Sequence, residues 1–280
     1  MMFPDFDPVI FSIGPIALRW YSLAYIAGLL LGWFYIRRLL ATPHLWAGGR
    51  APMAPMQVDD LLVWVTLGVI LGGRLGHVLF YNAGYYFSHP LEILQVWNGG
   101  MSFHGGLLGT VIAMMLFARR NGLVLFSIGD LVAAAVPFGL FFGRIANFIN
   151  GEIVGSPTTM PWGIIFPEWG PEPRHPAMLY EAALEGIALF FVLRHFTHSR
   201  GALMRPGLTA GAFLVGYAVF RMVCELFKIV DYRLIAPPLP ITKGMVLSVP
   251  MLAAGFMIIW IATRAVQAGS AKPRPAEEGA

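Results

Sequence analysis

The chain has 280 residues, of which 57% are hydrophobic and 12% are charged. This charged share is about half of that in an ordinary soluble domain, so the composition excludes a soluble enzyme and places the chain in a bilayer. The net charge of +4 comes from basic residues between apolar segments, a pattern that reflects membrane topology and excludes a nucleic-acid partner.

Seven apolar stretches are long enough to cross a hydrocarbon layer of about 30 Å. In chain order they cover residues 17–37, 60–81, 102–118, 129–150, 177–194, 208–227 and 244–263, and the third and fifth are short. Residues 1–10 hold no Lys or Arg, so we expect the first stretch to stay in the mature protein rather than to be cleaved as a signal peptide. The pattern predicts an all-α, polytopic membrane protein with about seven transmembrane helices.

Basic residues gather in every second connection between these stretches. They are Arg37, Arg38, Arg50, Arg119, Arg120, Arg194, Arg200, Arg205, Arg264, Lys272 and Arg274. The other connections hold only Arg174, Lys228, Arg233 and Lys243. The positive-inside rule therefore predicts a periplasmic N-terminus and a cytoplasmic C-terminus.

Residues 1–266 are expected to form a single transmembrane domain. One outer connection, residues 151–176, is longer than the others and rich in Pro, Gly and Trp, which predicts a small periplasmic cap. Residues 267–280 are rich in Ala, Pro and Glu, so we expect a disordered cytoplasmic tail.

Three arginines, Arg74, Arg144 and Arg221, lie within apolar stretches, where each costs roughly 2.5 to 3.5 kcal/mol to insert. Their helices are expected to start at the cytoplasmic face. At about 1.5 Å per residue, each arginine then lies roughly 20 Å along its helix, so all three are expected in one layer of the outer membrane half. Tyr21 and His104, on helices that run the other way, reach the same layer.

Two interpretations of these arginines stand side by side. They either pair with carboxylates for assembly, as Arg221 and Glu225 can at i, i+4, or hold an anion at the outer leaflet. Glu181 is the expected structural partner of one of them. Because few acidic residues are expected nearby, we favour the anion, and a phospholipid headgroup is the anion most available there. Guanidinium donors match phosphate well.

Further polar residues surround this layer. If the fourth stretch stays helical to its end, Arg144, Asn147 and Gly151 share one face. His104 is followed by two glycines, which leave room for a ligand, so a functional role is favoured over helix packing. His175 is interpreted as a loop residue.

Two other functions fit the sequence less well. An anion transporter needs a polar path across the membrane, yet the inner parts of the helices, such as residues 61–67 and 131–137, are apolar. An intramembrane protease needs paired aspartates, an HExxH zinc motif or a serine–histidine dyad in facing helices, and none of these occurs in the sequence. The only cysteine, Cys224, lies in an apolar run, so neither a disulfide nor a metal site is expected.

The thirteen residues from Gly143 to Gly155, GRIANFINGEIVG, resemble the signature of the prolipoprotein diacylglyceryl transferase family over their whole length. The likeness extends through most of the chain and thins in residues 156–173 and in the tail. It includes residues 6–11, 18–21, 72–74, 99–107, 174–176 and 216–221.

The resemblance implies an enzyme of the bacterial cell inner membrane that carries out the first step of lipoprotein maturation. Such an enzyme transfers the diacylglyceryl group of phosphatidylglycerol to the thiol of the lipobox cysteine in a prolipoprotein signal peptide. A thioether forms and glycerol 1-phosphate leaves. The expected partners are thus phosphatidylglycerol, the signal peptide and the lipid bilayer, and no cofactor is expected.

The family pattern also assigns roles to residues. It implies that Arg144 and Arg221 bind the phosphate, and that Asn147, Glu152 and Gly155 belong to the binding signature. Tyr21, His104 and Tyr217 line the site, and we expect His104 to accept the thiol proton. Arg74, the third arginine of the layer, is expected to contact the headgroup as well.

Overall fold

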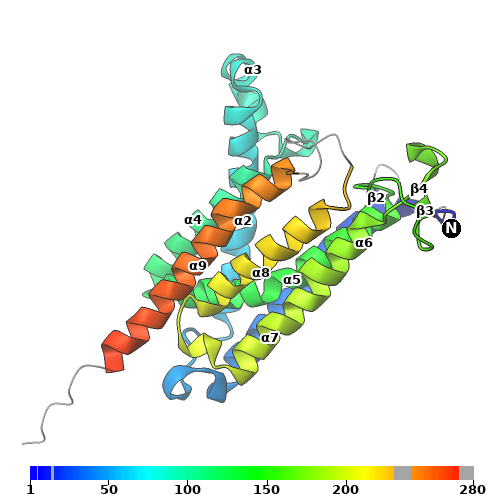
Figure 1. Ribbon diagram of the computed structural model, residues 1–280. Coiled ribbons are helices and arrows are strands. Elements are labelled where there is room, and N and C mark those ends of the chain that lie inside the picture. The colour runs from blue at the N-terminus through cyan, green and yellow to red at the C-terminus, as the bar shows by residue number, and fades with distance from the viewer. Residues whose placement is uncertain (5, 14–15, 230–240, 271–280) are drawn as a thin grey trace, which may run out of the picture. The chain divides into compact units, whose positions relative to one another are not determined.

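The computed structural model describes residues 1–4, 6–13, 16–229 and 241–270 (Figure 1). The described residues form two compact units, one from those within 1–36 and 130–270 and the other from 37–129. Helices dominate both units, which confirms the predicted helical character of the chain. Residues 271–280 of the expected tail lie outside the described part, and the helix before them continues to Ser270.

The first unit contains most of the long helices. Its elements are β1 (Val9–Ile13), β2 (Ile16–Arg19), most of α1 (Trp20–Leu40) and of α5 (Leu125–Ile149), β3 (Ile164–Ile165), η5 (Pro167–Trp169), β4 (Pro173–Arg174), α6 (Ala177–Glu181), the π-helical segment η6 (Ala182–Ala188), α7 (Leu189–Ser199), η7 (Ala202–Met204), α8 (Leu208–Glu225) and α9 (Lys243–Ser270). The segments α6, η6 and α7 follow one another without a break and make one continuous helix. Helices α8 and α9 run side by side, as Figure 1 shows.

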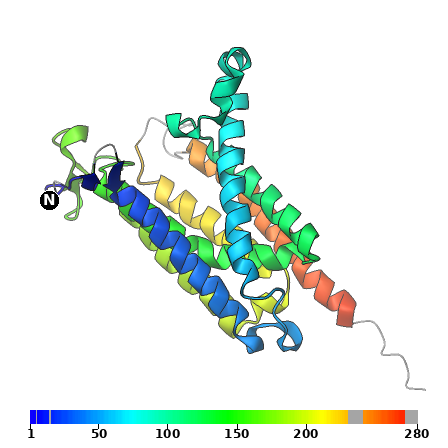
Figure 2. The same ribbon diagram turned by 180° about the vertical axis from the view of Figure 1, so that it is seen from behind.

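The second unit is built on two helices packed side by side. Its elements are η1 (Pro43–Leu45), η2 (Ala47–Gly49), α2 (Gln57–Phe80), α3 (Ala83–Ser88), η3 (Pro90–Leu94), η4 (Val96–Asn98) and α4 (Phe103–Asn121). Helices α2 and α4 lie against each other along much of their length (Figure 2).

Five helices in the described residues are long and apolar enough to cross a membrane. They are Trp20–Leu40, Gln57–Phe80, Leu125–Ile149, Leu208–Glu225 and Lys243–Arg264. The two expected spans that are missing from this set correspond to α4 and to the continuous helix α6–α7, the same two that the sequence marks as short. A multi-pass membrane protein is therefore confirmed, while the number seven stays a prediction.

The N-terminal segment differs from the expectation. We expected the first helix to begin at residue 17, but Ile16–Arg19 form β2, which pairs antiparallel with β1, and α1 begins only at Trp20. Val9, Ile10, Ile13 and Ile16 are β-branched and favour strands, but so short an apolar run cannot be separated from a helix start by hydrophobicity alone.

Close glycine contacts hold neighbouring helices together. A Cβ atom on Gly109 of α4 would lie 2.0 Å from the Gly68 carbonyl oxygen of α2, and one on Gly72 would lie 2.4 Å from the Gly105 carbonyl oxygen. In the first unit, a Cβ on Gly28 of α1 would lie 2.9 Å from Gly139 Cα of α5. Small residues let these backbones approach, which is how helices gain packing energy in a bilayer.

Helix α8 is anchored at its start by a buried carboxylate of α5. Asp130 accepts hydrogen bonds from the backbone N–H groups of Gly207 and Ala210, each at 2.7 Å. These are first-turn groups that have no partner within the helix, so the aspartate caps α8 from another element. The contact fixes α8, and with it Arg221, against α5.

The expected cap, residues 151–176, forms a small folded region. Strands β3 (Ile164–Ile165) and β4 (Pro173–Arg174) pair antiparallel, and Met2 adds a parallel bridge to Ile165. A compact hydrophobic cluster includes Ile164 of β3 and consists of Val154, Ile164, Phe166 and Met178, with Phe3 and Phe148 packed against it.

Candidate functional site

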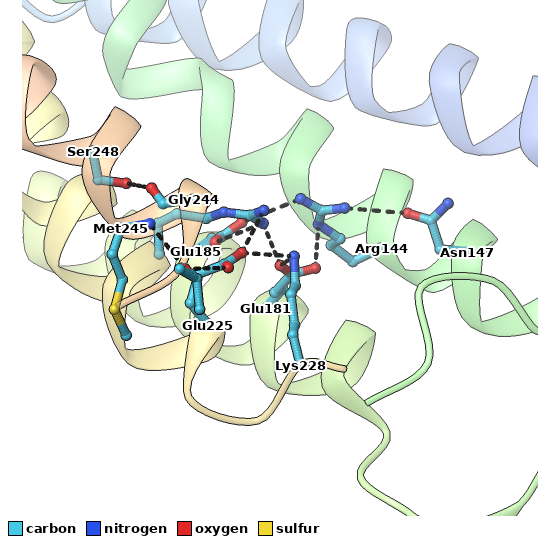
Figure 3. Close-up of polar contacts among 11 residues, drawn as sticks. Arg144, Asn147, Glu181, Glu185, Glu225, Lys228, Gly244, Met245 and Ser248 are labelled. Atoms are coloured by element: carbon cyan, nitrogen blue, oxygen red, sulfur yellow. Dashed lines mark hydrogen bonds and ion pairs between the residues drawn. The ribbon is translucent and has the colours of Figure 1, made fainter. Parts of the chain in front are cut away.

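Six charged side chains of the first unit gather in one place, which we call the ionic cluster. Its members are Arg144, Glu181, Glu185, Arg221, Glu225 and Lys228. They come from α5, the continuous helix α6–α7, α8 and the turn after α8 (Figure 3). Three cations thus face three carboxylates in a largely buried setting.

Arg144 and Arg221 share one carboxylate. Arg144 Nε lies 2.9 Å from Glu181 Oε2, and Arg221 Nη1 donates to Glu181 Oε1. Glu181 is fully buried, whereas the arginine side chains are 17% and 22% exposed. The two guanidinium groups therefore converge on a common anion from separate helices, and both side chains remain partly exposed.

Lys228 is a third cation that pairs with the Glu181 carboxylate. The sequence alone identifies it only as a basic residue of an outer connection. Its Nζ lies 2.7 Å from Glu181 Oε1 and 3.2 Å from Glu225 Oε1. Glu225 also meets Arg221 Nη2 at 2.8 Å, so the expected i, i+4 ion pair is confirmed. Thr242, at the start of α9, donates to Glu225 Oε2 at 2.7 Å and thereby ties that helix to the cluster.

Three acidic residues in the cluster correct one expectation. We expected few carboxylates near the arginines, but Glu181, Glu185 and Glu225 all lie there. Glu181 is the partner of both Arg144 and Arg221, rather than of one arginine. The spacing of Glu181 and Glu185 at i, i+4 was a signal that both point the same way, but the element facing them could not be read from it.

The signature segment extends the cluster through amide groups. Arg144 Nη1 donates to Asn147 Oδ1 at 3.4 Å, and Asn147 Nδ2 donates to Glu152 Oε2 at 3.0 Å. Figure 3 shows Arg144 between Asn147 and the carboxylate of Glu181. The expected helical face is correct for Arg144 and Asn147 but wrong for Gly151, because α5 ends at Ile149 and Gly151 has a left-handed φ of +67°.

The turn after Gly151 is strained. Ile153 is β-branched and has a φ of +56°, a conformation that such residues rarely adopt. Strain of this kind persists only where the surroundings hold the backbone in place. Here the neighbouring Val154 is buried in the cap, and Glu152 is held by Asn147 and by Asn150.

Gly155 has a steric role that its place in the signature did not reveal. A Cβ at this position would lie 2.6 Å from the carbonyl oxygens of both His175 and Phe227. Gly155 also forms an antiparallel bridge with Lys228. The absence of a side chain therefore lets the backbone before Lys228 approach, which brings that lysine to the cluster.

The two tyrosines occupy different positions. Tyr217 lies one turn before Arg221 on α8, and its hydroxyl is within electrostatic range of Glu185, Arg221, Arg144 and Glu181. Tyr21 is the second residue of α1 and packs against Tyr25, with ring centroids 5.2 Å apart. Tyr217 thus borders the ionic cluster, while the described contacts of Tyr21 are with its own helix.

Arg74 and His104 belong to the second unit. Arg74 is buried, and its Nε, Nη1 and Nη2 donate to main-chain carbonyls of residues 92–100 at 2.6 to 3.3 Å. Its guanidinium also lies over the Tyr86 ring. His104, at the start of α4, is exposed and has Phe103 as its ring neighbour. Arg74 thus holds the loop that leads into α4, and the loop precedes His104.

His175 lies at the end of the cap, just before α6. His175 Nδ1 lies 3.0 Å from the Tyr180 hydroxyl, which also accepts from Trp162 Nε1 at 2.7 Å. Burial lowers the pKa of the His175 imidazole, which favours the neutral ring. His175 is therefore a structural bridge between the cap and α6, in keeping with its interpretation as a loop residue.

The fold and the ionic cluster together define the class of protein to which this chain belongs. The chain is a multi-pass helical membrane protein that holds guanidinium groups from two helices around one anion, beside a folded cap. Such a site suits a substrate with a phosphate group and apolar chains, since arginine matches phosphate and the surrounding helices are apolar. In the described residues, no group of three or more His, Cys, Asp or Glu side chains could hold a metal ion.

Comparison with known proteins narrows the class to one family. The family model for prolipoprotein diacylglyceryl transferase matches residues 8–261. The phosphatidylglycerol–prolipoprotein diacylglyceryl transferase of Rhizobium meliloti is 54% identical over 271 residues, which cover 96% of this chain and 95% of the relative. The like-named protein of Phenylobacterium zucineum is 53% identical, with 93% and 94% covered. The chain belongs to the prolipoprotein diacylglyceryl transferase family.

Proposed function

We propose that the chain transfers the diacylglyceryl group of phosphatidylglycerol to the thiol of the lipobox cysteine of a prolipoprotein. The thiolate sulfur attacks the glycerol carbon that carries the phosphate ester, and the carbon–oxygen bond breaks as the thioether forms. The bonding electrons leave with the phosphate oxygen, so glycerol 1-phosphate is released. The thiol proton passes to a base. Bacterial lipoprotein maturation begins with this step.

The observation that carries the proposal is the convergence of Arg144 and Arg221 on Glu181. Two guanidinium groups that share one carboxylate are close enough to share one phosphate. Displacement at carbon leaves charge on the departing phosphate oxygen, and preorganised cations in a low-dielectric site stabilise that charge. Arg144 and Arg221 therefore act as the phosphate clamp in this mechanism.

The other site residues have supporting roles in the proposed mechanism. Asn147 and Glu152 hold the guanidinium of Arg144 in place, and Gly155 admits the backbone that carries Lys228. Tyr217 and Tyr21 line the lipid site, and His104 accepts the thiol proton. Arg74 acts on the substrate only indirectly, through the loop before His104, because its donors reach main-chain carbonyls.

The proposal includes a topology. The chain crosses the bacterial inner membrane seven times, with α4 and the α6–α7 helix as the shorter spans, and residues 1–266 act as one catalytic domain. The N-terminus and the cap, residues 151–176, face the periplasm, where lipobox cysteines and outer-leaflet phosphatidylglycerol meet. The alternation of basic connections supports this orientation.

Mass spectrometry of a lipobox peptide tests the function. The purified protein is incubated with the peptide and phosphatidylglycerol, and the peptide is expected to gain the mass of one diacylglyceryl group. A peptide with serine in place of the cysteine is the control and should gain nothing. Cleavage of the peptide, or an unchanged mass with an intact and folded protein, would overturn the proposal.

A further inference from the structure

Glu185 stands apart from the other carboxylates of the ionic cluster. Its side chain is fully buried, and neither Oε1 nor Oε2 has a hydrogen-bond partner among the described residues. The nearest cationic atoms are Arg144 Nη2 at 3.7 Å and Arg221 Nη1 at 3.9 Å. A buried carboxylate without hydrogen bonds is poorly stabilised in its charged form.

The other two carboxylates are well supported. Glu181 meets Arg144 Nε, Arg221 Nη1 and Lys228 Nζ directly. Glu225 meets Arg221 Nη2 at 2.8 Å and the Thr242 hydroxyl at 2.7 Å. Of the three, Glu185 therefore loses least when its charge is removed.

The location of Glu185 keeps it close to the cations. It lies in the π-helical segment η6, and the next residue, Gly186, packs so tightly on α5 that a Cβ would lie 2.7 Å from Phe141 Cβ. Segments of this kind often occur at functional sites. The titratable and charged groups that act on Glu185 are Glu181 of its own helix, Arg144 of α5, Tyr217, Arg221 and Cys224 of α8, and Lys228.

The net charge of the ionic cluster explains why binding of an anion favours uptake of a proton. With all groups ionised, three cations and three carboxylates cancel, so an added phosphodiester would leave one uncompensated negative charge among buried groups. Such a charge is unfavourable in a low-dielectric setting. Protonation of one carboxylate restores neutrality, and the phosphodiester itself does not titrate near neutral pH.

We propose that binding of the anionic phosphatidylglycerol headgroup at the ionic cluster is coupled to uptake of one proton by Glu185. This inference rests on the proposed function, because it takes the lipid phosphate as the ligand of Arg144 and Arg221. Glu185 thereby makes the headgroup affinity depend on pH. It is a positioning and charge-balancing residue and not a group that attacks the substrate.

The sign of the effect follows from the direction of proton movement. Because the complex binds one more proton than the free protein, affinity falls as pH rises. The fall approaches tenfold per pH unit wherever Glu185 is ionised in the free protein and protonated in the complex. Below that range the affinity becomes independent of pH.

Titration calorimetry of the detergent-solubilised protein tests the coupling. Dihexanoyl phosphatidylglycerol is the probe, and each titration is repeated in buffers of different ionisation enthalpy from about pH 5 to about pH 8. The slope of the measured enthalpy against buffer enthalpy gives the number of protons taken up. We expect about one proton per bound lipid in part of this range, with an affinity that falls as pH rises.

Two isosteric variants make the test specific. Glu185→Gln carries no titrating proton, so it should bind the probe with no proton uptake and with an affinity independent of pH. Glu168→Gln removes an exposed carboxylate of the cap and should behave like the unmodified protein. The unmodified protein alone gives the proton count, and Glu185→Gln, shown to be folded by thermal unfolding in detergent, identifies the group that takes up the proton.

The outcomes separate the inference from the proposed function. Binding of the probe without proton uptake at every pH overturns the coupling and leaves the transferase proposal intact. A pH dependence that persists in Glu185→Gln also overturns it, since another group must then take the proton. No binding of the probe by the folded protein, together with no peptide modification, contradicts the proposed function itself.

Discussion

Arg144 uses its guanidinium in several directions at once. Nε faces Glu181, Nη1 reaches Asn147, and Nη2 lies near Glu185. A single ammonium group cannot make these contacts and also clamp a phosphate, because it lacks the planar fork of donors. The identity of this residue, and not its charge alone, is therefore what the site requires.

Replacing Arg144 by Lys should lower kcat/KM by about 100-fold or more, the scale seen when one preorganised donor is lost from a charge-stabilising site. The variant should still insert and fold, since lysine can keep an ion pair with Glu181. Diacylglyceryl transfer to a lipobox peptide measures activity, and thermal unfolding in detergent measures stability. Arg37→Lys, at an exposed ion pair with Asp59, serves as the control. Near-normal activity of the Arg144 variant would remove the two-donor clamp from the mechanism.

Replacing His104 by Gln should suppress transfer and change the pH profile of kcat/KM, because the proton acceptor for the thiol is lost. Glutamine keeps the polar volume but does not titrate. The profile is measured with the peptide substrate over the range where imidazole titrates. His89→Gln, in an exposed position near α3, is the matched control. An unchanged profile would show that another group accepts the proton.

Between elements, close backbone contacts set the geometry of the site. Gly186 lets the α6–α7 helix approach α5 at Phe141, one turn before Arg144. Asp130 holds the start of α8 and so fixes the helix that carries Arg221. The distance between the two arginines is thus determined by contacts that make no link to substrate.

Replacing Gly186 by Ala should push these helices apart, because the added Cβ would lie 2.7 Å from Phe141 Cβ and 2.9 Å from Phe141 Cα. We expect a destabilisation of roughly 1 to 3 kcal/mol, as for other overpacked sites, and a loss of transfer activity. Thermal unfolding and the peptide assay measure the two effects. Gly84→Ala is the control, since a Cβ there meets nothing within 4 Å. Equal effects of both variants would argue against a role for this contact.

For the molecule as a whole, the orientation of the chain in the membrane determines which leaflet, and therefore which substrates, the ionic cluster can reach. The native sequence offers a simple way to test it, because its only cysteine, Cys224, is fully buried. Introduced cysteines can therefore be labelled without a large background. Thr159 in the cap and Ser199 at the end of α7 are both exposed, and the proposed topology predicts that they lie on opposite sides of the membrane.

In intact cells whose outer membrane has been made permeable, a membrane-impermeant maleimide should label Thr159→Cys. Ser199→Cys should react only after the inner membrane is disrupted, because the positive-inside rule puts that connection in the cytoplasm. The unmodified chain is the control and should not react. The reverse pattern would invert the proposed topology and place the ionic cluster at the wrong leaflet.

The amino-acid pattern alone was enough for the membrane class, for five of the seven predicted spans and for the family. These features depend on local composition and on the signature from Gly143 to Gly155, both of which can be read along the chain. It also singled out Arg144, Arg221 and Asn147 as candidate site residues, because buried cations and a polar helix face stand out in an apolar background.

Only the tertiary structure decided how these residues are used. It showed that the Glu181 carboxylate pairs with both Arg144 and Arg221. Lys228, from the turn after α8, pairs with the same carboxylate. Arg74 instead donates hydrogen bonds to main-chain carbonyls. Such partners come from distant segments, and a sequence does not state which helix faces which. The physical reason is that pairing of buried charges depends on distances of a few ångströms between elements, which only the packed fold fixes.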